Sequence, residues 1–158
     1  MDKKDIVSFL YGSFDENDSK VLAVTPAVNG VRLPDLVTKF EEAKNYEPVG
    51  GYGGIIPGWF DYGPLEKYFL GEYGQDSYWA KLGTAYILGC KCGEVGCWPL
   101  ECRIRVEGND VVWDHFSQPH RNAPTIRSLD LSSSMALSTE MHLVNSSLES
   151  PSPFDYFA

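Results

Sequence analysis

The segment Cys102–Phe116, CRIRVEGNDVVWDHF, decides the fold that this chain is expected to adopt. Its first half alternates apolar and basic side chains with the two-residue period of a strand. Glu107–Asp110 is a tight-turn sequence, and a run rich in Val and aromatic residues returns from it. The segment therefore predicts an antiparallel hairpin, in which Cys102 and Ile104 face the core and the intervening arginine faces away.

The flanking sequence predicts elements that pack against this hairpin. Residues 20–25 and 84–90 have the length and composition of strands. Residues 34–43 form an amphipathic helix, because apolar side chains at 33, 36, 37 and 40 recur at i, i+3, i+4 and i+7. We expect a single α+β domain in which a mainly antiparallel sheet, built from the N-terminal strand and residues 84–116, carries one or two packed helices.

Length, composition and charge narrow the classes of function. The chain has 158 residues, 43% of them hydrophobic and 22% charged, as in one globular domain. Thirteen Lys and Arg against 22 Asp and Glu give a formal net charge of −9, which would repel a nucleic-acid backbone. No stretch has the ~20 apolar residues of a membrane span, and the N-terminus lacks the apolar core of a signal peptide. We expect a cytoplasmic protein that binds neither nucleic acid nor a membrane.

The main chemical signal is a cluster of cysteines between two predicted strands. Cys90, Cys92 and Cys97 lie on a turn punctuated by glycines, and Trp98 follows directly. If the turn curls back on itself, the three thiols can meet beside this tryptophan. Cys102 belongs to the next strand, whose alternation buries it in the core.

Three interpretations of this cysteine turn stay open. Tetrahedral zinc would need a fourth ligand from Cys102, His115 or His120, and the spacing C-x-C-x4-C-x4-C differs from the usual paired C-x2-C knuckles. Two neighbouring thiols could instead cycle between dithiol and disulfide, with Lys91 lowering a thiol pKa, although no C-x-x-C stands at a helix N-terminus. The favoured interpretation is that free cysteines pack the turn as small hydrophobes.

A second polar group, Gln118, His120 and Arg121, follows the hairpin. These side chains either bond backbone groups where the chain leaves the sheet, which is the favoured interpretation, or line a site. The Asp, His and Ser just before them are not taken as a catalytic triad, because no G-x-S-x-G elbow presents a nucleophile. Since the hairpin returns the chain to its starting edge, we expect the group to pack against the cysteine turn.

Residues 46–63 are rich in glycine and proline and carry several aromatic side chains. The favoured interpretation is a surface loop without regular structure. The alternative is that its aromatic residues form the wall of a ligand pocket or partner surface. Those residues are Tyr52, Trp59, Phe60 and Tyr62.

The motif L-G-C-x-C-G-E-x-G-C-W-P-L at 88–100, followed by V-W at 112–113 and F-x-Q-P-H-R at 116–121, resembles a family of small bacterial proteins. The family brings no established activity. The resemblance implies that the cysteine turn and the residues after the hairpin form one unit, and that Cys102 is not part of it. The unit comprises Cys90, Cys92, Cys97, Trp98, Gln118, His120 and Arg121.

The last segment, 128–158, is broken by serines and prolines and is expected to be a poorly structured tail after a globular domain of residues 1–127. Members of the family end in a stretch resembling F-G-P-F-x-F-D-x-x-Q-Y-x-x-A. One choice of synonymous codons for 128–142, read from the third base, encodes F-G-P-F-E-F-D-G-A-Q-Y-G-N-A. We therefore hypothesise a frameshift between about Arg121 and Ser128, which the codons of the gene test.

These observations favour a non-enzymatic binding or interaction module built around the cysteine turn. Its ligand would be an unidentified protein or small molecule, and it would need no cofactor. The alternative is a zinc- or thiol-dependent enzyme that uses Cys90, Cys92 and Cys97, with His120 as the acid/base group.

Overall fold

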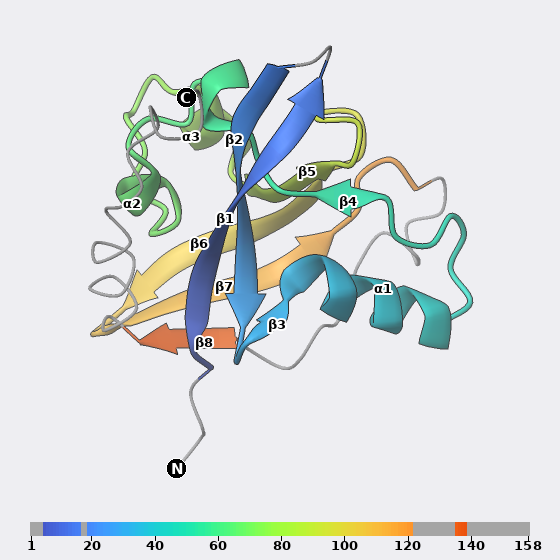
Figure 1. Ribbon diagram of the computed structural model, residues 1–158. Coiled ribbons are helices and arrows are strands. Elements are labelled where there is room, and N and C mark those ends of the chain that lie inside the picture. The colour runs from blue at the N-terminus through green and yellow to red at the C-terminus, as the bar shows by residue number, and fades with distance from the viewer. Residues whose placement is uncertain (1–4, 17–18, 122–134, 139–158) are drawn as a thin grey trace.

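The computed structural model describes residues 5–16, 19–121 and 135–138, which form two antiparallel sheets with short helices beside them (Figure 1). The first sheet has the strand order β1-β2-β3 and the second β4-β5-β6-β7-β8. The strands are β1 (Val7–Glu16), β2 (Ser19–Val28), β3 (Val31–Arg32), β4 (Tyr52–Gly53), β5 (Ala85–Cys90), β6 (Leu100–Glu107), β7 (Asp110–Ser117) and β8 (Met135–Ser138). The helices are α1 (Leu33–Ala43), α2 (Leu65–Tyr68), α3 (Tyr78–Leu82) and the 3-10 turn η1 (Pro57–Trp59).

The predicted hairpin is confirmed as β6 and β7. Glu107 pairs with Asp110, so the chain reverses between them where the tight turn was expected. Cys102 is fully buried, whereas Arg103 on the opposite face is exposed. The structure therefore confirms an α+β domain. In the described part of the chain, no helix is long and apolar enough to span a membrane.

The N-terminal strand does not extend the sheet of residues 84–116, in contrast to the prediction. β2 pairs along its length with β1 on one side, while β3 and a bridge from Val24 to Ile55 occupy the other. Because both edges of β2 are occupied, the N-terminal strands form a sheet of their own. In Figure 1 this sheet crosses over β6 and β7.

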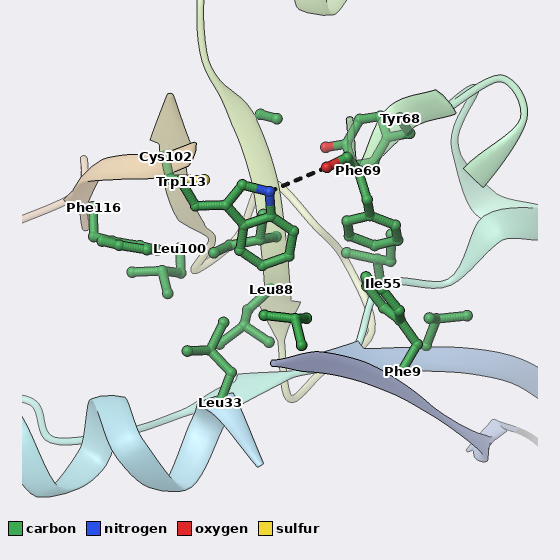
Figure 2. Packing of buried hydrophobic residues seen from close by; sticks show 14 of the residues in the cluster. Phe9, Leu33, Ile55, Tyr68, Phe69, Leu88, Leu100, Cys102, Trp113 and Phe116 are labelled. Atoms are coloured by element: carbon green, nitrogen blue, oxygen red, sulfur yellow. Dashed lines mark hydrogen bonds between the residues drawn. The ribbon is translucent and has the colours of Figure 1, made fainter. Parts of the chain in front are cut away.

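Aromatic side chains from distant parts of the sequence fill the space between the two sheets (Figure 2). The ring of Phe9 from β1 lies 4.4 Å from that of Phe69 and 6.4 Å from that of Trp113 on β7. The indole Nε1 of Trp113 donates a 3.1 Å hydrogen bond to the carbonyl of Phe69. This bond satisfies the polar atom of a tryptophan that is completely buried.

The predicted amphipathic helix is α1, with Pro34 in its first turn. Pro34 suits this position because the first backbone N–H groups of a helix have no partner within the helix. Leu33 and Val37, both on the inner face of this helix, are fully buried. The apolar stripe of the helix therefore faces the core, as the periodicity predicted.

The segment predicted as a tail lies outside the described residues except for Met135–Ser138. These four residues form β8 and pair antiparallel with β7, from Trp113↔Met135 to Asp110↔Ser138. The edge of β7 away from β6 presents backbone N–H and C=O groups that an extended segment can pair with, whatever its side chains. The pairing of β8 with β7 therefore does not depend on which side chains β8 carries. It does not test the frameshift hypothesis, which stays a prediction.

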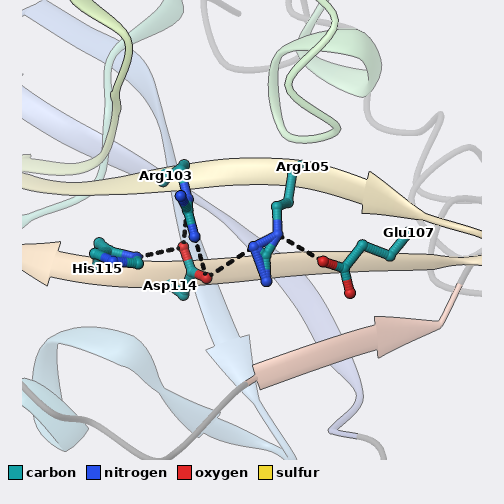
Figure 3. Close-up of polar contacts among 5 residues, drawn as sticks. All are labelled: Arg103, Arg105, Glu107, Asp114 and His115. Atoms are coloured by element: carbon teal, nitrogen blue, oxygen red, sulfur yellow. Dashed lines mark hydrogen bonds and ion pairs between the residues drawn. The ribbon is translucent and has the colours of Figure 1, made fainter.

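The exposed face of the hairpin carries a charge cluster centred on Asp114 (Figure 3). Its carboxylate accepts two hydrogen bonds of 2.9 Å from Arg103, one of 3.1 Å from Arg105 and one of 2.8 Å from His115. The bidentate bond from Arg103 is the main cause that lowers the pKa of Asp114 to about 2. The cluster ties β6 to β7 from the outside.

Replacement of this carboxylate, Asp114→Asn, is expected to lower the free energy of unfolding at pH 7 by less than about 1 kcal/mol, because water screens exposed ion pairs. Since the folded-state pKa is depressed, the wild-type advantage is present above pH ~4 and is lost as the pH falls toward 2. Urea unfolding of both proteins across this range measures the difference. A difference that does not change with pH would contradict the assignment.

Candidate functional site

The three thiols predicted to meet lie together at the end of β5. Each Sγ atom of Cys90, Cys92 and Cys97 is within 4.8 Å of the other two. Cys90 is the last residue of β5 and is buried, whereas Cys92 and Cys97 are exposed on the turn that leads to β6. The cluster is therefore anchored in the sheet on one side and open to solvent on the other.

The local backbone explains why the turn brings the sulfurs together. Gly93 has a φ of +96° and donates a 2.9 Å hydrogen bond to the carbonyl of Cys90, which closes a tight turn around Cys92. A Cβ atom at Gly93 would lie 2.5 Å from the ring of Trp59 and 2.9 Å from that of Phe14. This glycine is thus required both by its conformation and by the aromatic rings packed against it.

Hydrogen bonds within the cluster separate the acidities of the thiols. The backbone N–H of Cys92 donates to the sulfur of Cys90 over 3.5 Å. Hydrogen bonding from the backbone of Glu94, followed by that from Cys90, lowers the pKa of Cys92. Cys97 shifts in the opposite direction, because its hydrogen bonds to Cys90 and Cys92 raise its pKa to about 11. The cluster therefore makes Cys92 a more acidic thiol than an ordinary cysteine and Cys97 a less acidic one.

Cys102 is separate from this cluster. It is fully buried in the core, where desolvation raises the pKa of its thiol well above the usual value. A protonated thiol buried in the core cannot bind a metal ion together with the cysteines of the turn. The structure places Cys102 in the core with Leu100 and Trp113 (Figure 2), as strand alternation predicted.

Gln118 and His120 contact the turn that carries the cysteines. The side-chain Nε2 of Gln118 donates 2.7 Å to the carbonyl of Pro99, and its oxygen accepts from the backbone N–H of His120. The Nε2 atom of His120 bonds the carbonyl of Gly96 at 2.8 Å. Its ring stacks on Trp98 with 6.4 Å between centroids. These contacts hold the end of β7 to the cysteine turn.

Arg121 forms a buried ion pair with Glu41 of α1. The side chains are 1% and 0% exposed, and Nη2 of the arginine donates to a carboxylate oxygen of the glutamate and, over 3.0 Å, to the carbonyl of Pro48. The guanidinium lies 5.3 Å from the ring centre of Tyr46 and 5.6 Å from that of Trp98. Arg121 therefore contacts the helix, the loop after it and the cysteine turn at once.

The other bonds of Glu41 position the loop that runs beside the cysteines. Its carboxylate accepts 2.9 Å bonds from the backbone N–H of Gly50 and from the hydroxyl of Tyr52. Tyr52 in turn pairs with Cys90 as β4 against β5, and the N–H of Lys91 donates 2.9 Å to Gly51. A continuous set of contacts thus runs from α1 to the first thiol.

Glu41 was not among the residues predicted for the site, although it lies on the buried face of α1. The signal was its spacing, since Leu33, Val37 and Glu41 lie four residues apart and share the buried face of α1. A carboxylate in line with an apolar stripe indicates a buried partner, because an unpaired charge there would be too costly. Only the arginine eighty positions later supplies that partner.

Of the four aromatic residues predicted to wall a pocket, Trp59, Phe60 and Tyr62 line one cavity, and Tyr52 lies outside it. Tyr52 belongs to the Glu41 network, and Trp59 packs edge-on against Phe14 with 5.5 Å between centroids. Phe60 and Tyr62 line cavities beside α3 and beside the cysteine turn. The loop therefore supports the cysteine turn with one part and forms cavity walls with another.

Arg121→Met is expected to lower the free energy of unfolding by about 3–5 kcal/mol, because it leaves the carboxylate of Glu41 buried without its cation. Adding Glu41→Leu should cost less than the sum of the two single changes. Arg32→Met, at an exposed position, is the control. Denaturant unfolding gives the free energy of unfolding of Arg121→Met, Glu41→Leu, the double variant and Arg32→Met. If Arg121→Met loses no more stability than Arg32→Met, the ion pair does not stabilise the fold.

Comparisons with known proteins add no name to this site. No family model matches the chain, and neither the curated proteins nor the solved structures include a significant match. The resemblance of the motif at 88–121 to a bacterial family stays a prediction, and the chemistry of the side chains has to carry the functional argument.

Proposed function

We propose that this protein is a non-enzymatic binding module whose cysteine turn holds a thiophilic metal ion, with zinc as the ion. The observation that carries the proposal is the convergence of three sulfurs within 4.8 Å on an exposed turn. Thiolates of cysteine are the ligands that structural zinc sites use most. The proposal combines the expected binding module with zinc, which the sequence offered only as an alternative.

The spacing of the sulfurs fits a tetrahedral ion with little movement. Zinc–sulfur bonds of about 2.3 Å place two tetrahedral sulfur ligands about 3.8 Å apart. The atoms need to close by no more than about 1 Å from their present upper limit of 4.8 Å. Cys92 and Cys97 are exposed, so their side chains can move by this amount and an ion can reach them.

Three protein ligands leave the fourth position of a zinc ion to water or to an outside ligand. Cys102 is in the core, and the Nε2 atom of His120 is already engaged with the carbonyl of Gly96. Because that carbonyl only accepts, Nε2 carries the hydrogen and is not the atom that would bind metal. His120 accordingly positions the turn through Nε2, and Nδ1 is the ring nitrogen that its predicted role as an acid/base group would use.

The lowered pKa of Cys92 is one observation that favours a second candidate, thiol chemistry without metal. A thiolate beside two further thiols can form a disulfide when an oxidant accepts the two electrons. The two candidates differ in what protects the thiols. Zinc protects them reversibly and is released by a chelator, whereas a disulfide is released only by a reductant.

Zinc titration of the reduced full-length chain, in competition with a chromophoric chelator, tests the proposal. We expect one ion per chain, with the two exposed thiols, Cys92 and Cys97, reactive toward iodoacetamide before zinc and protected after it. Cys90→Ser, Cys92→Ser and Cys97→Ser should each weaken binding by at least about tenfold, and Cys102→Ala, a change in the core, should not. Absence of stoichiometric binding, with loss of two thiols to a disulfide, would reject zinc and favour thiol chemistry.

The affinity for zinc is expected to rise with pH. Cys97 carries a proton at neutral pH because its pKa is raised to about 11, and zinc must displace that proton. Binding should therefore release at least one proton at pH 7. Calorimetry in two buffers of different ionisation enthalpy measures the number released, and binding without proton release would show that the Cys97 sulfur is not a ligand.

A further inference from the structure

The structure assigns a second binding site to the cavity between α3 and the loop that precedes α2, and the ligand class that fits it is a small organic cation. The cavity has a volume of about 490 Å³, which is in the range of small-molecule sites. In Figure 1, α2 and α3 lie next to each other at one side of the molecule, away from α1. The site shares no cysteine with the proposed metal site and does not depend on it.

Aromatic rings make the floor and one wall of this cavity. Trp79 is 1% exposed and Tyr62 is 6% exposed, and their rings stack with 5.6 Å between centroids and an angle of 10°. Phe60 and Tyr78 also line the cavity and are 38% and 49% exposed, with 5.5 Å between their ring centroids. Large aromatic side chains held this exposed, over a buried aromatic floor, provide apolar area and negative ring faces to a ligand.

Carboxylates make the rim. Asp61, Glu72 and Asp76 line the cavity and are exposed, and no Lys, Arg or His is among the described residues that line it. The basic residues of the two helices, Lys67 and Lys81, are outside the lining. The potential in the cavity is therefore negative, in a chain whose net charge is −9.

This combination selects a cation with an apolar body over the other small ligands. An anion would meet three carboxylates, and a neutral apolar molecule would gain nothing from them. A hydrated metal ion would gain little binding energy from the aromatic rings, because its water shell keeps it away from them. An alkylammonium or quaternary ammonium group satisfies both parts, because its charge faces the carboxylates and ring faces while its carbon surface covers the rings.

The test compares choline with 3,3-dimethyl-1-butanol, which has the same shape without the charge. Both are titrated into the full-length chain and followed by amide chemical shifts. We expect choline to bind with shifts concentrated at residues 60–64 and 72–79, and the neutral alcohol to bind at least about tenfold more weakly. Equal binding of the two compounds, or shifts located elsewhere, would overturn the assignment. So would binding of a lysine-rich peptide without binding of choline.

Variants separate the contributions of the rings and the rim. Tyr78→Leu keeps an apolar side chain but removes the ring face, and should lower the affinity for choline about two- to fivefold. Glu72→Gln combined with Asp76→Asn should lower it by a similar factor. Glu66→Gln on α2 removes one negative charge outside the lining and should leave the affinity for choline unchanged. Thermal unfolding confirms that each variant is folded, and equal affinities in all of them would overturn the site.

Discussion

The buried ion pair between Glu41 and Arg121 is the constraint on which the rest of this structure depends. Two charges that are 0% and 1% exposed have lost their hydration, and only their mutual contact and further hydrogen bonds offset that loss. The carboxylate uses its remaining capacity on Gly50 and Tyr52, and the guanidinium lies between the rings of Tyr46 and Trp98. The pair thus fixes α1, the loop after it and the end of β7 relative to one another.

The cysteine turn takes its position from this frame. β4 pairs with the end of β5 at Cys90, and Trp98 on the far side of the turn donates its indole N–H to Gly50 over 3.0 Å. The turn is therefore held at both ends. Between these ends Gly93 and Val95 pack inward, while Cys92 and Cys97 stay exposed. Such a turn is rigid enough to bring three sulfurs together and exposed enough to exchange a ligand.

The loop from Ile56 to Tyr62 connects this turn to the proposed cation site. Phe60 and Tyr62 line both the large cavity and a smaller one of about 190 Å³, whose other wall is formed by Gly93 and Val95 of the cysteine turn. A ligand in either place contacts the same two rings. The aromatic loop is thus a shared wall of two cavities, one beside the backbone of the cysteine turn and one rimmed by carboxylates.

Patterns within short segments were enough to predict the local elements and the meeting of three cysteines on one turn. Alternation in Cys102–Phe116 predicted the hairpin and the burial of Cys102, and the period in 33–40 predicted α1, because these patterns depend on neighbours close in the chain. Three outcomes came from the folded structure alone: the N-terminal strands form a separate sheet, Glu41 pairs with Arg121, and Phe60 and Tyr78 line one cavity with three carboxylates. These outcomes depend on contacts between residues far apart in the chain, and the period of a short segment carries no information about its distant partner.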